Sequence, residues 1–281
     1  MEKIISKALY VVSTPIGHLE DISYRAVHVL KHVDLILCED TRVTKKLLDY
    51  YRIETPYEAF HQYNEHEKTI ETLAKLKQGQ AIALVSDAGT PLISDPGYPL
   101  IAACIDEDIR VIPIGGASAL LSALVASGMS TNPFYFHGFL PKKKSAKEKT
   151  LVSLNQLETT LIFYESPNRV FDTVQAMLKV FGNRKVTFAR ELTKKFETFT
   201  YTTLQEIEEN DIQTKGEYVI IVEGFVKPVK TFNEDAINDY NSYIEQGLSD
   251  KEAMKKIADL FKVSKRDVYQ LIKVRKEDSD E

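Results

Sequence analysis

Four segments within the first 120 residues carry residue types that could bind a small polar ligand. They are residues 13–17, 38–42, 86–97 and 113–119, and each follows or ends a short apolar run. Glycine in such segments lets a ligand approach the backbone closely, and a helix that starts there offers free N–H groups. Any one of them could be an ordinary turn, whereas four at one edge of a sheet indicate a shared pocket.

The residue types narrow the choice of ligand. Segment 86–97 holds Asp87 and Asp95 but no lysine, so it suits hydroxyl and amino groups better than phosphate. The chain has no GxxxxGK[ST] string and no GxGxxG after its first apolar run, which argues against a P-loop and an ordinary dinucleotide site. No cluster of His, Cys, Asp and Glu has the spacing of a metal site. Asp87 and Asp95 could bind Mg²⁺, and the alternative is that they cap helices or form Asx-turns. A nucleoside joined to an amino acid would match these groups.

Hydrophobic spacing predicts the elements that position the four segments. Strands are expected at 8–13, 33–38, 80–86 and 110–114, and helices at 23–31, 41–51, 65–77, 98–107 and 117–127. This alternation is typical of a mostly parallel sheet with helices on both faces. Ligands of such sheets bind beyond the carboxyl ends of the strands, which is where the four segments fall.

A second α/β region follows residue 128. Its expected strands are 134–137, 160–164, 185–190 and 217–223, and its expected helices are 144–157, 169–181 and 204–210. The last 50 residues show no strand signal and are expected to form three helices and an acidic tail at 277–281. The chain is therefore expected to divide into domains at 1–127, 128–227 and 228–281.

Composition excludes several classes of protein. The 281 residues include 36 Lys and Arg and 41 Asp and Glu, a net charge of −5, so the chain is not a general nucleic-acid coat. Cys38 and Cys104 match neither a disulfide framework nor a zinc site, which favours a reducing, cytoplasmic location. We find neither a secretory leader nor 18 consecutive apolar residues, so no membrane association is expected.

Two segments offer a local basic surface. Residues 142–149 hold five lysines and one acidic residue, and residues 251–276 hold nine Lys or Arg and three acidic residues. Within the second segment, a turn at 261–263 separates two helical patterns, and Ser264 with Asp267 matches a capping box. Such a pair with a basic second helix is typical of a helix-turn-helix that contacts nucleic acid. The alternative for residues 142–149 is a solvated loop, and the alternative for residues 251–276 is a small helical packing unit.

Several long strings of the sequence occur in a fixed order. They are LYVVSTPIGHLEDIS, CEDTR, ALVSDAGTPLISDPG, FYFHGFLP, FYESPNR, ARELTK and GEYVIIVEG. Through these strings, residues 8 to about 275 resemble the tetrapyrrole methylase superfamily, the class III methyltransferases. The likeness is greatest to those members that methylate the 2′-oxygen of a cytidine in 16S ribosomal RNA.

The resemblance implies a fold and a cofactor. It implies two α/β domains with S-adenosyl-L-methionine in the cleft between them, to which the residue pattern of 228–281 adds a small C-terminal helical module of helix-turn-helix type. It also implies a homodimer that acts on small-subunit rRNA, either free or in the assembled subunit. The residues implied to bind the cofactor come from both domains: Pro15, Asp87, Ala88, Gly89, Ser118, Ala119, Phe163, Tyr164, Gly216 and Glu217.

Methyl transfer to a ribose hydroxyl is an in-line displacement, so a group must accept the hydroxyl proton or stabilise the developing oxyanion. The candidates are polar residues without an obvious structural task. Five of them follow predicted strands, Glu39, Asp40, Arg42, Arg190 and Glu191, and the sixth, His61, lies in the polar segment 61–66. Structural alternatives are an ion pair between Glu39 and Arg42, a solvated helix start at His61, and a structural pair or phosphate contact at Arg190 and Glu191.

Two other functions remain open at the level of sequence. One is methylation of a tetrapyrrole or another small molecule, which has no use for the basic C-terminal helices. The other is a non-catalytic protein that binds nucleic acid and senses S-adenosyl-L-methionine.

Overall fold

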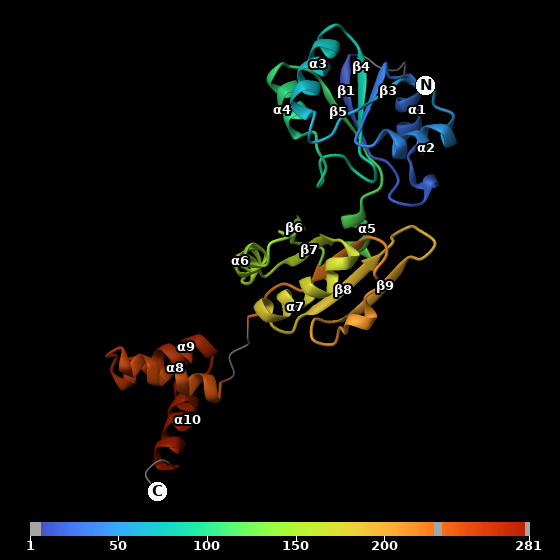
Figure 1. The fold of residues 1–281 in the computed structure, drawn as a ribbon. Helices are drawn as coiled ribbons and strands as arrows, with labels where there is room; N and C mark the ends of the chain where they lie inside the picture. The colour runs from blue at the N-terminus through green and yellow to red at the C-terminus, as the bar shows by residue number, and fades with distance from the viewer. Residues whose placement is uncertain (1–6, 228–231, 279–281) are drawn as a thin grey trace. The chain divides into compact units, whose positions relative to one another are not determined.

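The chain divides into two compact units, Met1–Phe225 and Val226–Glu281 (Figure 1). The computed structural model describes residues 7–227 and 232–278, without the side chains of Glu234 and residues 273–278. The last three residues of the predicted acidic tail, 279–281, lie outside the described residues.

The first unit begins with a fully parallel five-stranded sheet of order β3-β2-β4-β1-β5. Its strands are β1 (Ala8–Val12), β2 (Leu35–Cys38), β3 (Tyr57–Ala59), β4 (Ala81–Val85) and β5 (Val111–Ile114). The four strands expected from the sequence are confirmed. The short edge strand β3 was not expected, because its three half-buried residues are too few to show a period.

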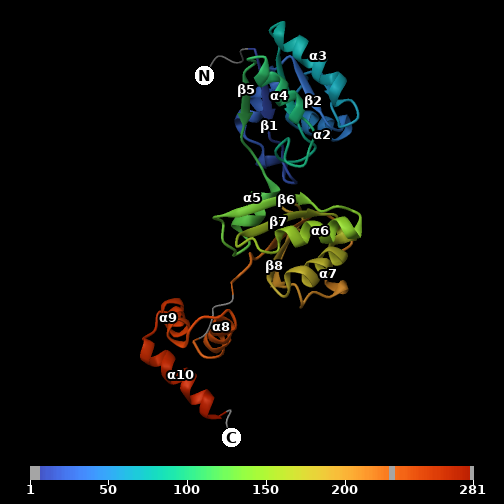
Figure 2. The same cartoon turned by 90° about the vertical axis from the view of Figure 1, so that its left-hand side faces the viewer.

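Helices cover both faces of this sheet (Figure 2). They are α1 (Tyr24–His32), α2 (Thr41–Tyr51), α3 (Glu65–Lys77) and α4 (Tyr98–Asp106), with the one-turn helix η1 (Leu19–Asp21) before α1. Alternate residues of each strand enter two cores, one under α1 and α2 and the other under α3 and α4. All residues of β1, β2 and β4 are therefore buried, as their continuous apolar runs indicate.

The second sheet of the first unit is mixed, with order β6-β7-β10-β8-β9. Only β6 and β7 run parallel. The strands are β6 (Phe134–Phe139), β7 (Thr160–Glu165), β8 (Lys185–Arg190), β9 (Thr198–Thr203) and β10 (Tyr218–Val222). One face packs against α6 (Lys144–Leu154) and α7 (Val170–Phe181), which follows η2 (Pro167–Arg169), and the other packs against α5 (Ala119–Val125) (Figure 2).

The helix expected at 204–210 is wrong. The chain instead leaves β9 in a turn, in which the Glu206 carboxylate accepts hydrogen bonds from the Thr202 hydroxyl at 3.0 Å and the Thr203 N–H at 3.2 Å. Only one helical turn follows, η3 (Glu209–Asp211). Leu204 and Ile207 are buried in the second sheet's core, so their apolar spacing reflects core packing and not a helix face. Strand β9 was also not expected from the sequence.

The second unit consists of α8 (Glu234–Glu245), α9 (Asp250–Phe261) and α10 (Lys265–Asp278), the three helices that the sequence indicates. Their shared core includes Tyr240, Ala253, Ile257 and Val268. The predicted capping box precedes α10: the Ser264 N–H donates to Asp267 Oδ2, and the Asp267 N–H donates to Ser264 Oγ at 3.2 Å. The predicted fold class is confirmed. No helix within residues 7–227 and 232–278 has the length and apolarity needed to cross a membrane.

Candidate active site

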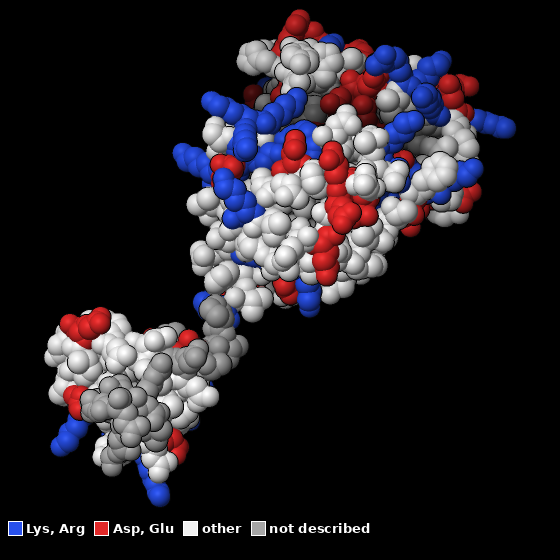
Figure 3. Space-filling model, turned by 60° about the horizontal axis from the view of Figure 1, so that its bottom comes forward, with Lys and Arg blue, Asp and Glu red and all other residues white. Residues whose placement is uncertain are grey.

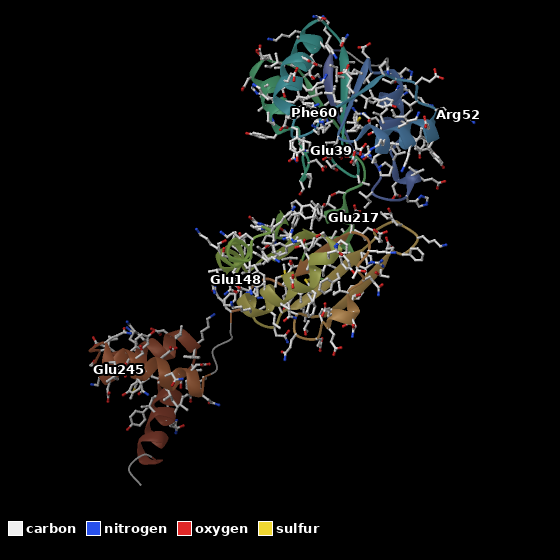
Figure 4. All side chains as sticks on the ribbon, in the orientation of Figure 1. Glu39, Arg52, Phe60, Glu148, Glu217 and Glu245 are labelled. Atoms are coloured by element: carbon white, nitrogen blue, oxygen red, sulfur yellow. The ribbon has the colours of Figure 1, made fainter. Side chains whose placement is uncertain are left out.

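A cavity of about 400 Å³ lies in the first unit, beyond the carboxyl ends of the strands of the first sheet. Its volume is within the range of small-molecule sites. Residues from both sheets line it: Ile16, Asp87, Ala88, Gly89, Thr90, Ile93, Ser94, Asp95, Ser118, Ala119, Phe139, Tyr164, Glu165, Ser166, Pro167, Gly216, Glu217, Tyr218 and Val219. Figure 4 shows Glu39 at the edge of the first sheet that faces the second, and Glu217 on the second sheet's side.

The loop after β4 forms one wall and is held by the loop after β1. Thr14 and Gly89 exchange backbone hydrogen bonds, with N–H to O distances of 2.8 and 3.1 Å. Gly89 has φ +82°, and a Cβ there would lie 3.2 Å from a methyl group of Ile16. The Thr90 hydroxyl also donates to the Ala117 carbonyl at 3.2 Å. Three of the four predicted ligand segments thus meet at one wall.

Eight of the ten predicted cofactor residues line the cavity: Asp87, Ala88, Gly89, Ser118, Ala119, Tyr164, Gly216 and Glu217. Pro15 is buried between Thr14 and Ile16, next to the wall. The side chain of Phe163 points to the other face of the second sheet and is fully buried in the core under α6 and α7. Successive residues of a strand point to opposite faces, so Tyr164 reaches the cavity and Phe163 does not.

Three carboxyl groups near the cavity influence one another. Burial raises the pKa of Asp95 to about 7, and the nearby charge of Glu39 adds to the effect. Burial also raises the pKa of Glu39 and of Asp87, and the charge of Asp87 raises that of Glu39 further. Oδ1 of Asp87 accepts the Asp40 N–H at 2.9 Å, which ties the ends of β2 and β4 together. These carboxyl groups favour a ligand that is positively charged or donates hydrogen bonds.

The neighbouring Asp40 and Arg42 have a structural arrangement. Asp40 is the N-cap of α2, and its Oδ1 accepts the Arg42 N–H at 2.8 Å. Arg42 Nη2 lies 2.6 Å from Asp40 Oδ2 on the exposed surface. Hydrogen bonds from Arg42 hold the pKa of Asp40 at about 2. The partner of Arg42 is therefore Asp40 and not Glu39. A catalytic part for either residue stays a prediction.

His61 lies near Glu39, whose pKa its charge would lower. Its backbone N–H donates to Asn64 Oδ1 at 2.8 Å, so the segment before α3 is shaped by that amide. Its Nδ1 is buried and has no hydrogen-bond partner among the described residues. The structure thus brings Glu39 and His61 together on the side of the first sheet.

Arg190 and Glu191 belong to the second sheet's side. Arg190 Nε donates to the Lys215 carbonyl at 2.9 Å, and Glu191 Oε1 accepts the Glu217 N–H at 3.1 Å and Lys194 Nζ at 3.0 Å. Gly216 has φ +103°, and a Cβ there would lie 2.6 Å from Glu191 Cγ. These contacts shape the part of the wall around Gly216, and a catalytic part for either residue stays a prediction.

Sequence reasoning did not assign several cavity residues to the site, among them Phe139 and Ser166. It placed Asp95 in the ligand segment 86–97 but named it neither as a cofactor residue nor as a catalytic residue, although both Asp87 and Asp95 follow a serine within one Gly- and Pro-rich segment. The described part of the chain holds no group of three or more His, Cys, Asp or Glu side chains that could bind a metal ion.

The fold is a pair of helix-covered sheets with a small-molecule cavity lined by residues from both, and comparison with known proteins identifies this class as the methyltransferases. The family model described as Tetrapyrrole (Corrin/Porphyrin) Methylases matches residues 8–208, and the chain belongs to this family. Two similar proteins carry the name ribosomal RNA small subunit methyltransferase I. The one from Halalkalibacterium halodurans is 45% identical over 270 residues, covering 94% of this chain and 93% of the relative. The one from Synechocystis is 46% identical over 270 residues, covering 94% and 96%.

Solved structures share the fold. The uroporphyrin-III C-methyltransferase of Thermus thermophilus, complexed with S-adenosylhomocysteine, has a TM-score of 0.56 at 16% identity, covering 77% of this chain and 97% of that one. Family membership confirms S-adenosyl-L-methionine as the expected methyl donor. The cavity suits this cofactor, since the carboxylate of Asp87 can accept hydrogen bonds from its amino and hydroxyl groups. Ile16, Ile93 and Val219 offer apolar surface for a base.

Proposed function

We propose that this chain transfers a methyl group from S-adenosyl-L-methionine to the 2′-oxygen of a cytidine in small-subunit (16S) ribosomal RNA. The observation that carries the proposal is the extent of the likeness to the rRNA methyltransferases. Those relatives cover 93 to 96% of the chain, whereas the small-molecule methyltransferase of known structure covers 77% of it. The difference is close to the size of the second unit, residues 226–281, which small-molecule methylation does not require.

The cavity's residues support the chemistry of this reaction. When bound, the cofactor supplies an electrophilic methyl group attached to a positively charged sulfur. Asp87 would bind its amino or ribose hydroxyl groups, and the negative charge of the site favours a cationic ligand. Asp95, with its pKa raised to about 7, is matched to accepting the proton of the ribose hydroxyl at neutral pH. Glu39 supports this role because its charge helps raise the pKa of Asp95.

Exposed basic side chains support binding to RNA. Lys142 and Lys143, just before α6, and Lys144 and Lys149, within it, are exposed, whereas Lys147 is buried. Figure 3 shows a group of Lys and Arg side chains on the flank of the first unit where Figure 1 places α6. In the second unit, the exposed basic residues of α9, the following turn and the start of α10 are Lys251, Lys255, Lys256, Lys262, Lys265 and Arg266. Both segments suit phosphate contacts.

A homodimer in the cytoplasm is part of the same proposal. Around α5, the apolar side chains of Leu121, Val125 and Tyr201 are at least half exposed. The Tyr201 hydroxyl donates to the Ala126 carbonyl at 3.0 Å, so the three belong to one surface at the edge of the second sheet. Large exposed apolar patches on folded proteins often mark protein–protein interfaces, and a second copy of the chain would cover this one.

The test is methylation with a labelled donor. Small subunits from cells that lack this modification are incubated with the protein and labelled S-adenosyl-L-methionine, and the label is mapped by nuclease digestion and mass spectrometry. We expect one labelled cytidine, with the methyl group on the 2′-oxygen. Label on a base, or label only on an added tetrapyrrole, would refute the proposal. Binding of cofactor and RNA without any turnover would indicate a sensor in place of an enzyme.

A further inference from the structure

Strand β6 contains an irregularity beside the cavity. Its pairing with β7 is regular from Phe134 to Phe136, and it resumes after a shift, with Gly138 opposite Phe163 and Phe139 opposite Tyr164. The extra residue is His137, and Gly138 has φ +77°. Such β-bulges reorient the side chains that follow them and are frequent next to active sites.

The bulge decides which face receives Phe139. Phe136 and Phe139 are three positions apart and would point to opposite faces of a regular strand. Because of the bulge, both pair with residues whose side chains lie on the α5 face, and both rings contact Tyr164, with centroid distances of 4.9 and 5.7 Å. Phe139 therefore lines the cavity, yet 53% of it is exposed.

The residues after Phe139 are basic and anchored. Arg169 Nη2 donates to the carbonyls of Leu140 at 2.9 Å and Pro141 at 3.1 Å, and Arg169 Nη1 lies 3.4 Å from Glu165. The carboxylate of Glu165 is buried and accepts the Thr173 hydroxyl at 2.8 Å. This network fixes the backbone between Phe139 and three exposed lysines, 142–144.

Phe139 is an exposed aromatic ring at the cavity, and exposed lysines follow it on an anchored backbone. The ring suits a nucleobase, and the lysines suit the adjoining phosphates. Proteins bind unstacked RNA bases on aromatic side chains and hold the adjoining phosphates with Lys or Arg. We infer that Phe139 is the platform on which the acceptor nucleobase stacks, and that Lys142, Lys143 and Lys144 hold the phosphates beside it. The inference rests on the proposed function, since it assigns the RNA subsite of the same cavity. It makes Phe139 a binding residue for the acceptor base and not for the cofactor.

The first test is kinetic. Phe139→Ala should lower kcat/KM for undermethylated small subunits by roughly 10- to 100-fold, as loss of one base-stacking contact does. Calorimetric affinity for S-adenosylhomocysteine should stay within about twofold to threefold. Phe139→Tyr should restore most of the rate, and Phe139→Leu, apolar but without a π face, should not. Phe134→Ala is the matched control, because Phe134 lies on the same strand, is 40% exposed and does not line the cavity.

The second test is spectroscopic and needs no turnover. The chain has no tryptophan, so Phe139→Trp places a single indole at the proposed platform and Phe134→Trp places one outside it. Single-stranded oligocytidylate should quench the fluorescence at 139 and not at 134. Inorganic polyphosphate, which has charge but no bases, should quench neither. Lys142, Lys143 and Lys144 changed together to Ala should weaken the quenching titration and flatten its salt dependence.

The outcomes separate this inference from the function on which it rests. Normal methylation by Phe139→Ala, or equal losses of methylation and of S-adenosylhomocysteine affinity, would overturn the platform while leaving the proposed function intact. Quenching at both positions or at neither would also overturn it. If the unmodified protein methylates no rRNA but oligocytidylate still quenches only the indole at 139, then the proposed function fails and the base-binding subsite stands.

Discussion

Asp95→Asn should make the protein more stable at high pH and less active. In the folded protein, burial and the charge of Glu39 raise the pKa of Asp95 from 3.8 to about 7. Between these two pH values, the unfolded chain has lost this proton whereas the folded protein still holds it. The free energy of unfolding therefore falls as pH rises from about 4 to 7, and the loss persists above pH 7. Asparagine cannot ionise, so the variant escapes this loss.

The size of the effect follows from the shift of the pKa. A shift of about three units corresponds to roughly 4 kcal/mol at 1.36 kcal/mol per unit. Asp95 is only partly buried, and solvent screening reduces this to about 1–2 kcal/mol. For a unit of 225 residues, 1 kcal/mol changes the Tm by about 2–4 °C. We therefore expect the Tm of Asp95→Asn to exceed that of the unmodified protein by about 2–8 °C at pH 8, and to equal it near pH 4.

The assay is calorimetry of both proteins from pH 4 to 8.5, following the transition of the first unit. The same substitution should lower methylation at least 100-fold, because the amide cannot accept the hydroxyl proton. The kcat of the unmodified protein should rise with pH through about 7. A difference in Tm that does not vary with pH would refute the raised pKa, and full activity of Asp95→Asn would refute its role as proton acceptor.

Three further expectations concern cofactor binding, the proposed catalytic residues Glu39 and Arg42, and RNA binding. Asp87→Ala should weaken S-adenosyl-L-methionine binding roughly 10- to 100-fold, because it removes a charged hydrogen-bond acceptor. Calorimetry on the folded variant measures this affinity, and an unchanged value would mean that Asp87 lies outside the site. Glu39→Gln and Arg42→Ala should lower turnover more than they change cofactor affinity; near-normal rates in both would place the chemistry elsewhere. Glu39→Gln should also move the acidic limb of the pH–rate profile to lower pH, because the charge of Glu39 raises the pKa of Asp95. Removing residues 228–281 should preserve cofactor binding, because the cavity is formed by residues earlier in the chain. The shortened protein should bind rRNA more weakly, and its affinity should depend less on salt concentration. If its salt dependence and activity equal those of the full chain, α8–α10 serve packing or dimerisation.

The sequence by itself determined four of the five strands of the first sheet and the edge at which the candidate ligand segments meet. Strands β1, β2 and β4 are continuous apolar runs because both faces of the sheet are covered, and each run ends at residues that form turns. Since all strands of this sheet are parallel, their carboxyl ends meet at one edge, and this is why the residue pattern alone assigns Asp87 and Ser118 to one pocket.

Only the tertiary structure decided which side chains enter the cavity. Neighbouring residues such as Phe163 and Tyr164 point to opposite faces, and the choice between them depends on pairing with other strands and on what covers each face. The bulge at His137 changes that choice for Phe139; Gly138 within the strand is a local sign of a bulge, but only the pairing with β7 gives its position and its effect. Leu204 and Ile207 look like a helix face in the sequence, yet they fill a core built by distant residues. The raised pKa of Asp95 has the same origin, because Glu39 lies 56 positions away in sequence and is brought near it only when β2 and β4 pair side by side.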